Sequence, residues 1–152
     1  MKYLYGVVLR QLDSLDYARD LLIETIAEQP FMWCFWYELS DCLRSTDQLT
    51  SILTRLPVHW MRDFFLGRAY HLLNLPEEAY QTYKYLRKSL FSNTPYVLAE
   101  MAKVCYGRRE NQEAFKLMEK NRASEPIRLD DMDFYSVVLY ARGDKVILSW
   151  KL

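Results

Sequence analysis

The cysteine and histidine residues have the greatest capacity for chemistry in this sequence. Cys34, Cys42, His59 and His71 lie in one stretch, and thiolates with imidazoles are the donors that zinc prefers. Their spacings match no known zinc pattern, and no cysteine or histidine forms an evident nucleophile–base pair. We therefore expect no metal and no cofactor. Buried packing cysteines and ordinary surface histidines are the favoured interpretation.

Two pairs of adjacent carboxylates could act as a general acid and base. They are Glu77-Glu78 and Asp130-Asp131. Both pairs fall at expected helix starts, where negative charge stabilises the helix dipole, and that role explains them without catalysis. A glycine-rich phosphate loop is also missing from the sequence. The residues therefore predict no catalytic site and no enzyme.

The composition limits the class of protein. The chain has 152 residues, 51% of them hydrophobic and 15% aromatic, which predicts one folded domain with a sizeable core. The low glycine count, four in the whole chain, argues against a strand-rich fold with many tight turns. The charges of the 20 basic and 20 acidic side chains cancel, so the net charge does not indicate binding to nucleic acid or to an anionic membrane.

The cysteine count and the N-terminal segment indicate the compartment. Three cysteines at wide spacing do not form a disulfide framework, which favours a reducing, intracellular environment. The segment "MKYLYGVVLRQLD" does not resemble a signal peptide, and no stretch approaches the ~20 apolar residues of a membrane span.

Small residues recur along the chain with one fixed spacing. The same 12 positions separate three pairs of them: Gly6 and Ala18, Gly67 and Ala79, and Ala102 and Ala114. Large residues and prolines follow at the offsets of the tetratricopeptide (TPR) repeat, a helix pair with a period of about 34 residues. The members assigned to this packing pattern also include Trp36, Tyr70, Tyr83 and Pro126. Small residues allow the two helices to approach closely, so we expect a stack of helix pairs.

One repeat is shorter than the others. Gly6 and Gly67 are 61 positions apart, whereas two full periods would be 68, so seven residues are missing. The second copy begins normally with Trp36, but its second helix ends early at Pro57. Ser45 and Gln48 are expected to form a capping box for that helix.

These features predict an all-α fold, a right-handed TPR superhelix of four helix pairs and a truncated fifth. The single array spans 1–152, with repeats at about 3–30, 33–57, 60–92, 95–126 and 129–152. Its last helix, 145–152, is cut off by the chain end. Asn74 and Asn93, each two residues before a proline, are expected to cap the helices that follow them.

Helix A of each repeat presents a face on which a solenoid binds ligands. The helical spacing places a basic and aromatic set on this face: Tyr37, Arg44, Phe64, Arg68, His71, Lys103 and Tyr106. Such a lining would suit an extended peptide with an acidic or carboxylate end. Alternatively, the arginines keep the face soluble while the aromatic rings pack. Both interpretations stay open.

A second candidate surface flanks the shortened repeat. Trp33 and Trp60 lie near helix starts, with Met32 and Met61 beside them. Because the deletion should break the local superhelix, these side chains are expected to dock a partner or a sister protomer. Packing within the repeats is the alternative.

Four segments resemble the subunit 8 family of the anaphase-promoting complex (cyclosome). They are "YLYGVVLRQLDSLDYARDLLIETI", "WYELSDCL", "HWMRDFFLGRAYHLLNLPEEAYQTYKYL" and "PIRLDDMDFYSVVLYARGDKVILSW". The resemblance runs from Tyr3 to Trp150, and the shortened second repeat and the run "RLDDMDFYSVVLY" are its specific features.

The resemblance implies a non-catalytic scaffold of a cell-cycle ubiquitin ligase. It also implies a location in the nucleus and cytoplasm, homodimerisation, and assembly with other subunits or activators. Two alternatives remain. One is a generic TPR adaptor that captures an acidic or carboxylate peptide tail. The other is an RNA-binding helical repeat, against which the zero net charge and the short second repeat count.

Overall fold

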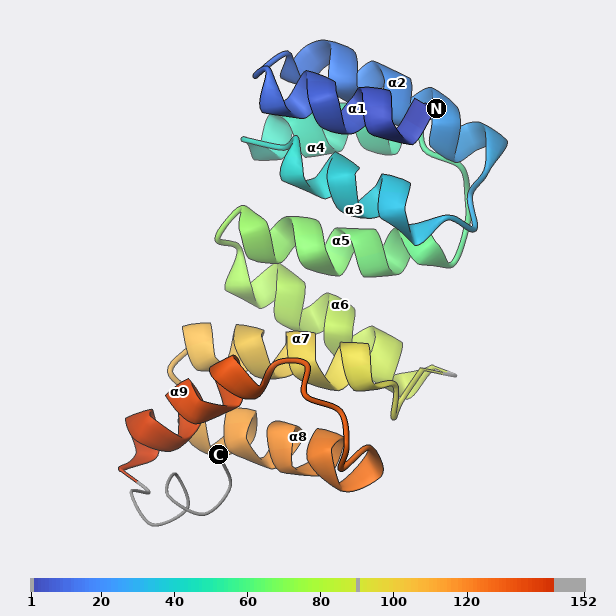
Figure 1. The fold of residues 1–152 in the computed structure, drawn as a ribbon. Helices are drawn as coiled ribbons and strands as arrows, with labels where there is room; N and C mark the ends of the chain where they lie inside the picture. Colours follow the sequence, from blue (N-terminus) through green and yellow to red (C-terminus); the bar gives the residue numbers. More distant parts are fainter. Residues whose placement is uncertain (1, 90, 144–152) are drawn as a thin grey trace. The chain divides into compact units, whose positions relative to one another are not determined.

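A computed structural model of the chain describes residues 2–89 and 91–143 (Figure 1). Within these ranges the chain forms nine α-helices and no strand, which confirms the all-α expectation. No helix in the described part of the chain is long and apolar enough to span a membrane. The number of repeats, the single array and its right-handed superhelix stay predictions, and helix 145–152 lies outside the described residues.

The chain divides into two compact units after Leu75. Unit 1 contains α1 (Lys2–Gln11), α2 (Leu15–Glu28), α3 (Trp33–Asp41), α4 (Thr46–Leu53) and α5 (Met61–Leu72). Unit 2 contains α6 (Pro76–Lys88), α7 (Pro95–Gly107), α8 (Asn111–Ser124) and α9 (Met132–Arg142).

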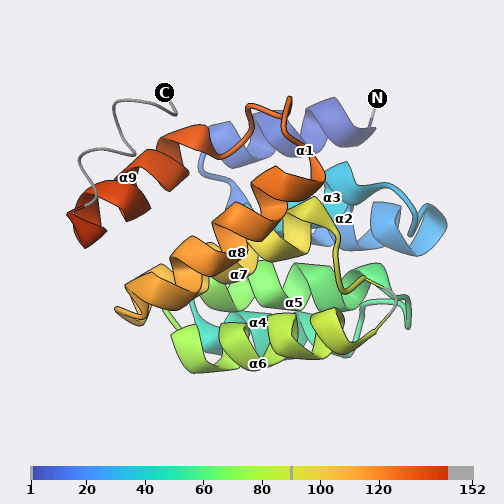
Figure 2. The same cartoon turned by 90° about the horizontal axis from the view of Figure 1, so that it is seen from below.

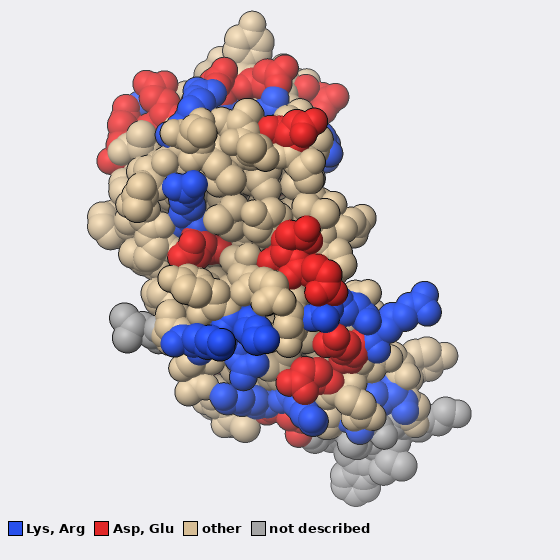
Figure 3. All heavy atoms as spheres, turned by 180° about the vertical axis from the view of Figure 1, so that it is seen from behind, with Lys and Arg blue, Asp and Glu red and all other residues tan. Residues whose placement is uncertain are grey.

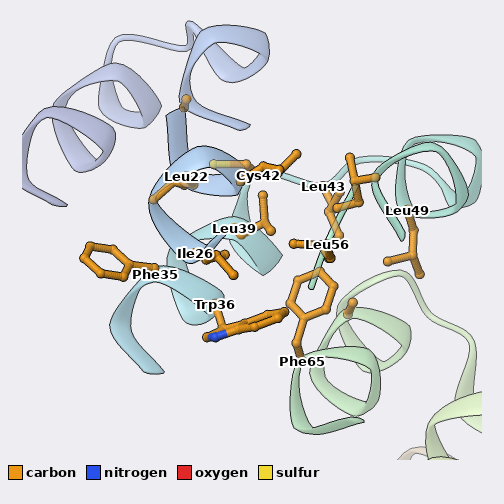
Figure 4. Packing of buried hydrophobic residues seen from close by; sticks show 14 residues of the cluster. Leu22, Ile26, Phe35, Trp36, Leu39, Cys42, Leu43, Leu49, Leu56 and Phe65 are labelled. Carbon is orange, nitrogen blue, oxygen red and sulfur yellow. The ribbon is translucent and has the colours of Figure 1, made fainter. Parts of the chain in front are cut away.

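The core of unit 1 is built around Trp36 of α3. Its ring lies against Phe65 of α5, with the ring centroids 5.7 Å apart, and Leu22 and Ile26 approach from α2 (Figure 4). The indole N–H donates to the carbonyl of Pro30 at 2.9 Å, so the one polar atom of this fully buried side chain is satisfied. Trp36 thus ties the loop before α3 to the core.

Burial of the TPR positions follows the repeat pattern closely. The structure buries Gly6, Ala18, Trp36, Gly67, Ala79, Tyr83, Ala102 and Ala114. Tyr70 is half-buried, and Pro126 is exposed. At Gly6 an added Cβ would first meet Leu22, at 3.1 Å from its Cδ2. The close approach of α1 and α2 is therefore limited by Leu22, one turn beyond Ala18.

Three helices, α1, α5 and α7, end in the same turn geometry. The residue seven positions after each small residue has a left-handed backbone, with φ of 57° at Asp13, 57° at Asn74 and 63° at Arg109. In each turn the next N–H bonds back to a carbonyl in the last helical turn at 2.9 Å: Ser14 to Leu9, Leu75 to Tyr70 and Glu110 to Cys105. This is the Schellman closure of a helix C-terminus. It gives the three repeats the same register.

The predicted caps at Asn74 and Asn93 are wrong. Asn74 ends α5 in the left-handed conformation, which asparagine adopts at low cost, and therefore does not begin α6. Asn93 is exposed, and the residue that precedes α7 is Thr94. In both places Pro at the first helical position begins the helix, because it lacks an N–H that would need a cap.

The shortened second repeat lacks this turn. Helix α3 ends one residue after Ser40, and α4 has only 8 residues, whereas α2, α6 and α8 have 14, 13 and 14. The predicted cap at Ser45 is confirmed: its hydroxyl accepts from the Gln48 N–H at 3.4 Å. The Gln48 side chain in turn accepts from the backbone N–H of Arg44 at 2.9 Å. Missing residues therefore shorten both the turn and the second helix.

In unit 2, α7 packs against α6 and α8, and α9 packs on α8 (Figures 1 and 2). Helix α7 is the most deeply buried element of this unit and contributes eight buried residues. A Lys103 ammonium of α7 bonds to Glu100 at 2.8 Å and to Asp131, the residue before α9, also at 2.8 Å. This ion pair fixes the start of α9 to α7.

Candidate protein-interaction surfaces

An aromatic surface joins the two loops that flank the shortened repeat. Phe31, before α3, meets His59 edge to face at 4.7 Å, and His59 lies beside Trp60 at 5.3 Å. Trp60 then contacts Phe64 of α5 at 5.7 Å. The ring of His59 is held in place, because its Nδ1 accepts the N–H of Met61 at 3.3 Å, at the first turn of α5.

The outer members of this group are exposed apolar side chains. We define the aromatic surface as Phe31, Met32, Val58 and Trp60, whose exposed fractions are 70%, 49%, 95% and 45%. These residues belong to the two loops that meet at the contact between Phe31 and His59, and patches of exposed apolar side chains often mark interaction sites. The rings beneath them leave little freedom for rearrangement, so a partner would meet a preformed surface.

The four residues predicted from the sequence for this surface differ in burial. Met32 and Trp60 are exposed as a docking role requires, whereas Trp33 and Met61 lie against the core, with Trp33 6.4 Å from Phe64. Phe31 and Val58 were missed. Each adjoins a proline at the end of a repeat, and that position in the connecting loops was the available signal. The role of all these residues in docking stays a prediction.

The predicted peptide-binding face of unit 1 is occupied by internal ion pairs. Arg68 of α5 donates from Nε to the Ser40 hydroxyl at 2.8 Å and from Nη2 to Asp41 at 2.9 Å. Its guanidinium also lies 3.7 Å from the centre of the Tyr37 ring. Asp41 neutralises Arg68, and the two side chains are only 23% and 14% exposed. An incoming carboxylate would therefore have to compete with Asp41.

A second ion pair on this face joins α1 to α3. Arg10 donates from Nε to Glu38 at 2.8 Å, and the Tyr3 hydroxyl approaches the same carboxylate at 3.5 Å. The Glu38 side chain is 9% exposed and the Arg10 side chain 32%. Burial lowers the pKa of Arg10, but the charge and the hydrogen bond of Glu38 outweigh it and leave the pKa raised. The pair couples the first repeat to the second.

The remaining groove candidates have different surroundings. Arg44 is exposed and His71 half-buried, and Phe64 is buried between Trp33 and Trp60. In unit 2, Tyr106 packs on Phe134 at 5.7 Å, and Lys103 is paired as described above. Their predicted role in binding peptide tails is untested.

Two of the three cysteines, Cys42 and Cys105, are buried. Burial raises the pKa of Cys42 and of Cys105 to about 11, so both thiols are protonated near neutral pH. No cluster of three or more potential metal ligands occurs within residues 2–89 and 91–143.

Comparisons with known proteins identify the family. The family model described as anaphase promoting complex subunit 8 / Cdc23 matches residues 1–102. Anaphase-promoting complex subunit 8 of Arabidopsis thaliana is 38% identical over 148 residues, covering 97% of this chain and 25% of that protein. The cell division cycle protein 23 homolog of Homo sapiens is 36% identical over 148 residues, covering 97% and 24%.

A third relative extends the match to a distant lineage. Anaphase-promoting complex subunit 8 of Dictyostelium discoideum is 34% identical over 148 residues, covering 97% of this chain and 25% of that protein. The chain thus spans about a quarter of the length of the curated relatives it matches. Since the family model covers most of the chain, the protein belongs to the anaphase-promoting complex subunit 8 / Cdc23 family.

Proposed function

We propose that this chain is a non-catalytic protein-interaction scaffold of the anaphase-promoting complex. In this role it pairs with a sister protomer and contacts other subunits or activators during cell-cycle ubiquitination. Two findings support the proposal: the family match and the protonated, buried cysteines, which are poor nucleophiles. The names of the relatives identify the complex, and the aromatic surface provides exposed apolar side chains for contact with a partner.

The aromatic surface is the observation that carries the proposed self-association. Its exposed members are Phe31, Met32, Val58 and Trp60, and tryptophan is the residue type most enriched among the dominant contributors to interfaces. None of these four side chains is charged, so burying them in an interface would not itself bury an unpaired ion.

The Trp60→Ala variant tests the proposal. Trp60 contacts His59 and Phe64 from outside, so truncation removes about half a ring of exposed surface without opening the Trp36 core. We expect self-association, measured by sedimentation velocity over a concentration series, to weaken roughly tenfold or more. Helical circular dichroism should stay unchanged.

Two further variants complete the test, the first as a control and the second as an independent change in the same surface. Tyr85→Ala removes a ring that is 62% exposed on α6 and should leave the dimer constant unaltered. Val58→Ser changes a side chain that is 95% exposed, so it cannot unfold the core, and it should weaken association in the same direction as Trp60→Ala. A wild-type chain that stays monomeric, or equal dimer constants for all variants, would refute the proposed role of this surface.

A further inference from the structure

A groove lies between α1 and α2 of unit 1, and none of the residues of the aromatic surface lines it. It has a volume of about 630 Å³ and is lined mainly by Tyr5 and Leu9 of α1 and by Tyr17 and Leu21 of α2. Tyr17 is 75% exposed. Along α1 the apolar surface continues through Leu4, Val8 and Leu12, which are spaced by four residues and exposed. The groove therefore has an apolar floor and an apolar lip.

Carboxylates form the opposite border of this groove. They follow α2 at four-residue spacing, at Asp16, Asp20, Glu24 and Glu28. Residues separated by four positions lie on one helix face, so the four charges make a continuous acidic stripe. Figure 3 shows acidic side chains gathered over this end of unit 1. Asp20 and Glu24 line the groove itself, together with Arg55.

The acidic stripe is only loosely neutralised within the described residues. Asp16 pairs with Arg19, Asp20 pairs with Arg55 at 2.7 Å, and Glu28 pairs with Lys2 at 2.7 Å, but the three carboxylate side chains are each more than half exposed. Exposed pairs of this kind contribute little and exchange readily. Glu24 forms no ion pair within the described residues, but its charge acts on Lys2: the hydrogen bond to Glu28 raises the pKa of Lys2, and the charge of Glu24 helps to raise it. An external cation can therefore reach the stripe at small cost.

The charge argues for a basic occupant and against a second copy of this chain. Residues 1–28 contain three basic and five acidic side chains, a net charge of −2. Two copies meeting at this groove would bring like charges together, which is unfavourable across an interface. The 14 residues of α2 extend about 21 Å, so an occupant that runs along α2 can be a helix of three to four turns.

We propose that the groove between α1 and α2 binds an amphipathic helix of a different protein. Its apolar side chains fill the space between Tyr5 and Tyr17, and its lysines or arginines face Asp20 and Glu24. This is the helix-in-groove mode of recognition, with apolar anchors for affinity and charge for orientation. The inference does not rest on the proposed dimer, since it uses none of the residues of the aromatic surface.

Synthetic helical peptides provide the probe. One peptide of roughly 14 residues carries leucines along one face and lysines on its flank, and a matched peptide replaces every lysine with glutamate. Fluorescence anisotropy with the full chain should show binding of the lysine peptide and at least about tenfold weaker binding of the glutamate peptide. Raising the salt from ~50 mM to ~500 mM should reduce this difference.

Two variants of the chain complete the test. Tyr17→Ala should weaken the lysine peptide roughly tenfold, and Tyr85→Ala is its matched control on α6. Glu24→Lys should narrow or reverse the preference between the peptides, whereas Glu78→Lys, the same charge change on α6, should not. No binding of the lysine peptide, equal binding of both peptides, or insensitivity to Tyr17→Ala and Glu24→Lys would overturn the proposal.

Discussion

The substitution Gly6→Ala tests the close approach of α1 and α2, and Gly107→Ala and Gly143→Ala are its comparisons. The chemical change is the same each time, but the surroundings differ. An added Cβ at Gly6 lies 3.1 Å from Leu22 Cδ2 and 3.4 Å from Leu22 Cγ. At Gly107, the last residue of α7, the Cβ meets no atom of the described residues within 4 Å. The same holds at Gly143, but the backbone there has φ of 76°.

The magnitudes follow from these geometries. In a helix, alanine is favoured over glycine by up to ~1 kcal/mol, and at the terminal Gly107 we expect about half of this as stabilisation. At Gly6 the same gain is opposed by overpacking of about 1–3 kcal/mol, because Leu22 is 1% exposed and has little room to move. Gly6→Ala should therefore destabilise unit 1 by ~1 kcal/mol. Gly143→Ala should cost ~1 kcal/mol through left-handed strain.

Urea unfolding measures these differences. Tryptophan fluorescence reports mainly on unit 1, which contains Trp33, Trp36 and Trp60, and circular dichroism reports on the whole chain. Two probes are needed because the two units need not unfold together. For each variant, the urea concentration at the midpoint and the slope of the free energy of unfolding against urea concentration should be compared with those of the wild type.

A double-mutant cycle isolates the contact between Gly6 and Leu22. Leu22→Ala alone should cost about 3–5 kcal/mol through the cavity that it leaves. In that background the added methyl partly fills the cavity, so Gly6→Ala should become stabilising by ~1 kcal/mol. If Gly6→Ala stabilises the wild type as much as Gly107→Ala does, then Leu22 does not limit the helix approach and our packing argument fails.

Three further predictions concern single residues. Arg109→Gly should stabilise unit 2 by ~1 kcal/mol in urea unfolding, since Arg109 has φ of 63°, whereas Arg109→Ala should not. Arg10→Ala should cost ~2 kcal/mol in thermal unfolding by leaving Glu38 buried without its counter-charge, and adding Glu38→Gln should recover part of this; no recovery would contradict the ion-pair argument. Iodoacetamide should label Cys34 before it labels the buried Cys42 and Cys105. Labelling of Cys42 and Cys105 should accelerate only as the pH approaches their pKa of about 11; equal labelling of the three cysteines at neutral pH would refute this.

The helices and their register were readable from the sequence because small residues control helix approach. The 12-position spacing from Gly6, Gly67 and Ala102 reappears in the structure as three equal turns at Asp13 and its counterparts. The shortened repeat was also visible, since a missing seven residues changes the spacing of such a pattern directly. Ser45 could be assigned because a capping box is a local interaction.

Features that depend on contacts between helices or loops were harder to predict from the sequence. Asn74 was assigned to the wrong helix, because asparagine is suitable both for a helix start and for a left-handed helix end. The pairing of Arg68 with Asp41 joins residues from two helices, and helical spacing places a basic side chain on a face without revealing its partner. Phe31 was missed because its exposure depends on the loop path that Trp36 fixes through Pro30.

Quantitative mass spectrometry of proteins that co-purify with the tagged chain from dividing cells tests the central claim most directly. Our account predicts enrichment of anaphase-promoting complex subunits with the wild type and reduced enrichment with Trp60→Ala, while Tyr85→Ala behaves as the wild type. The absence of these subunits from the wild-type sample would contradict the proposed scaffold function.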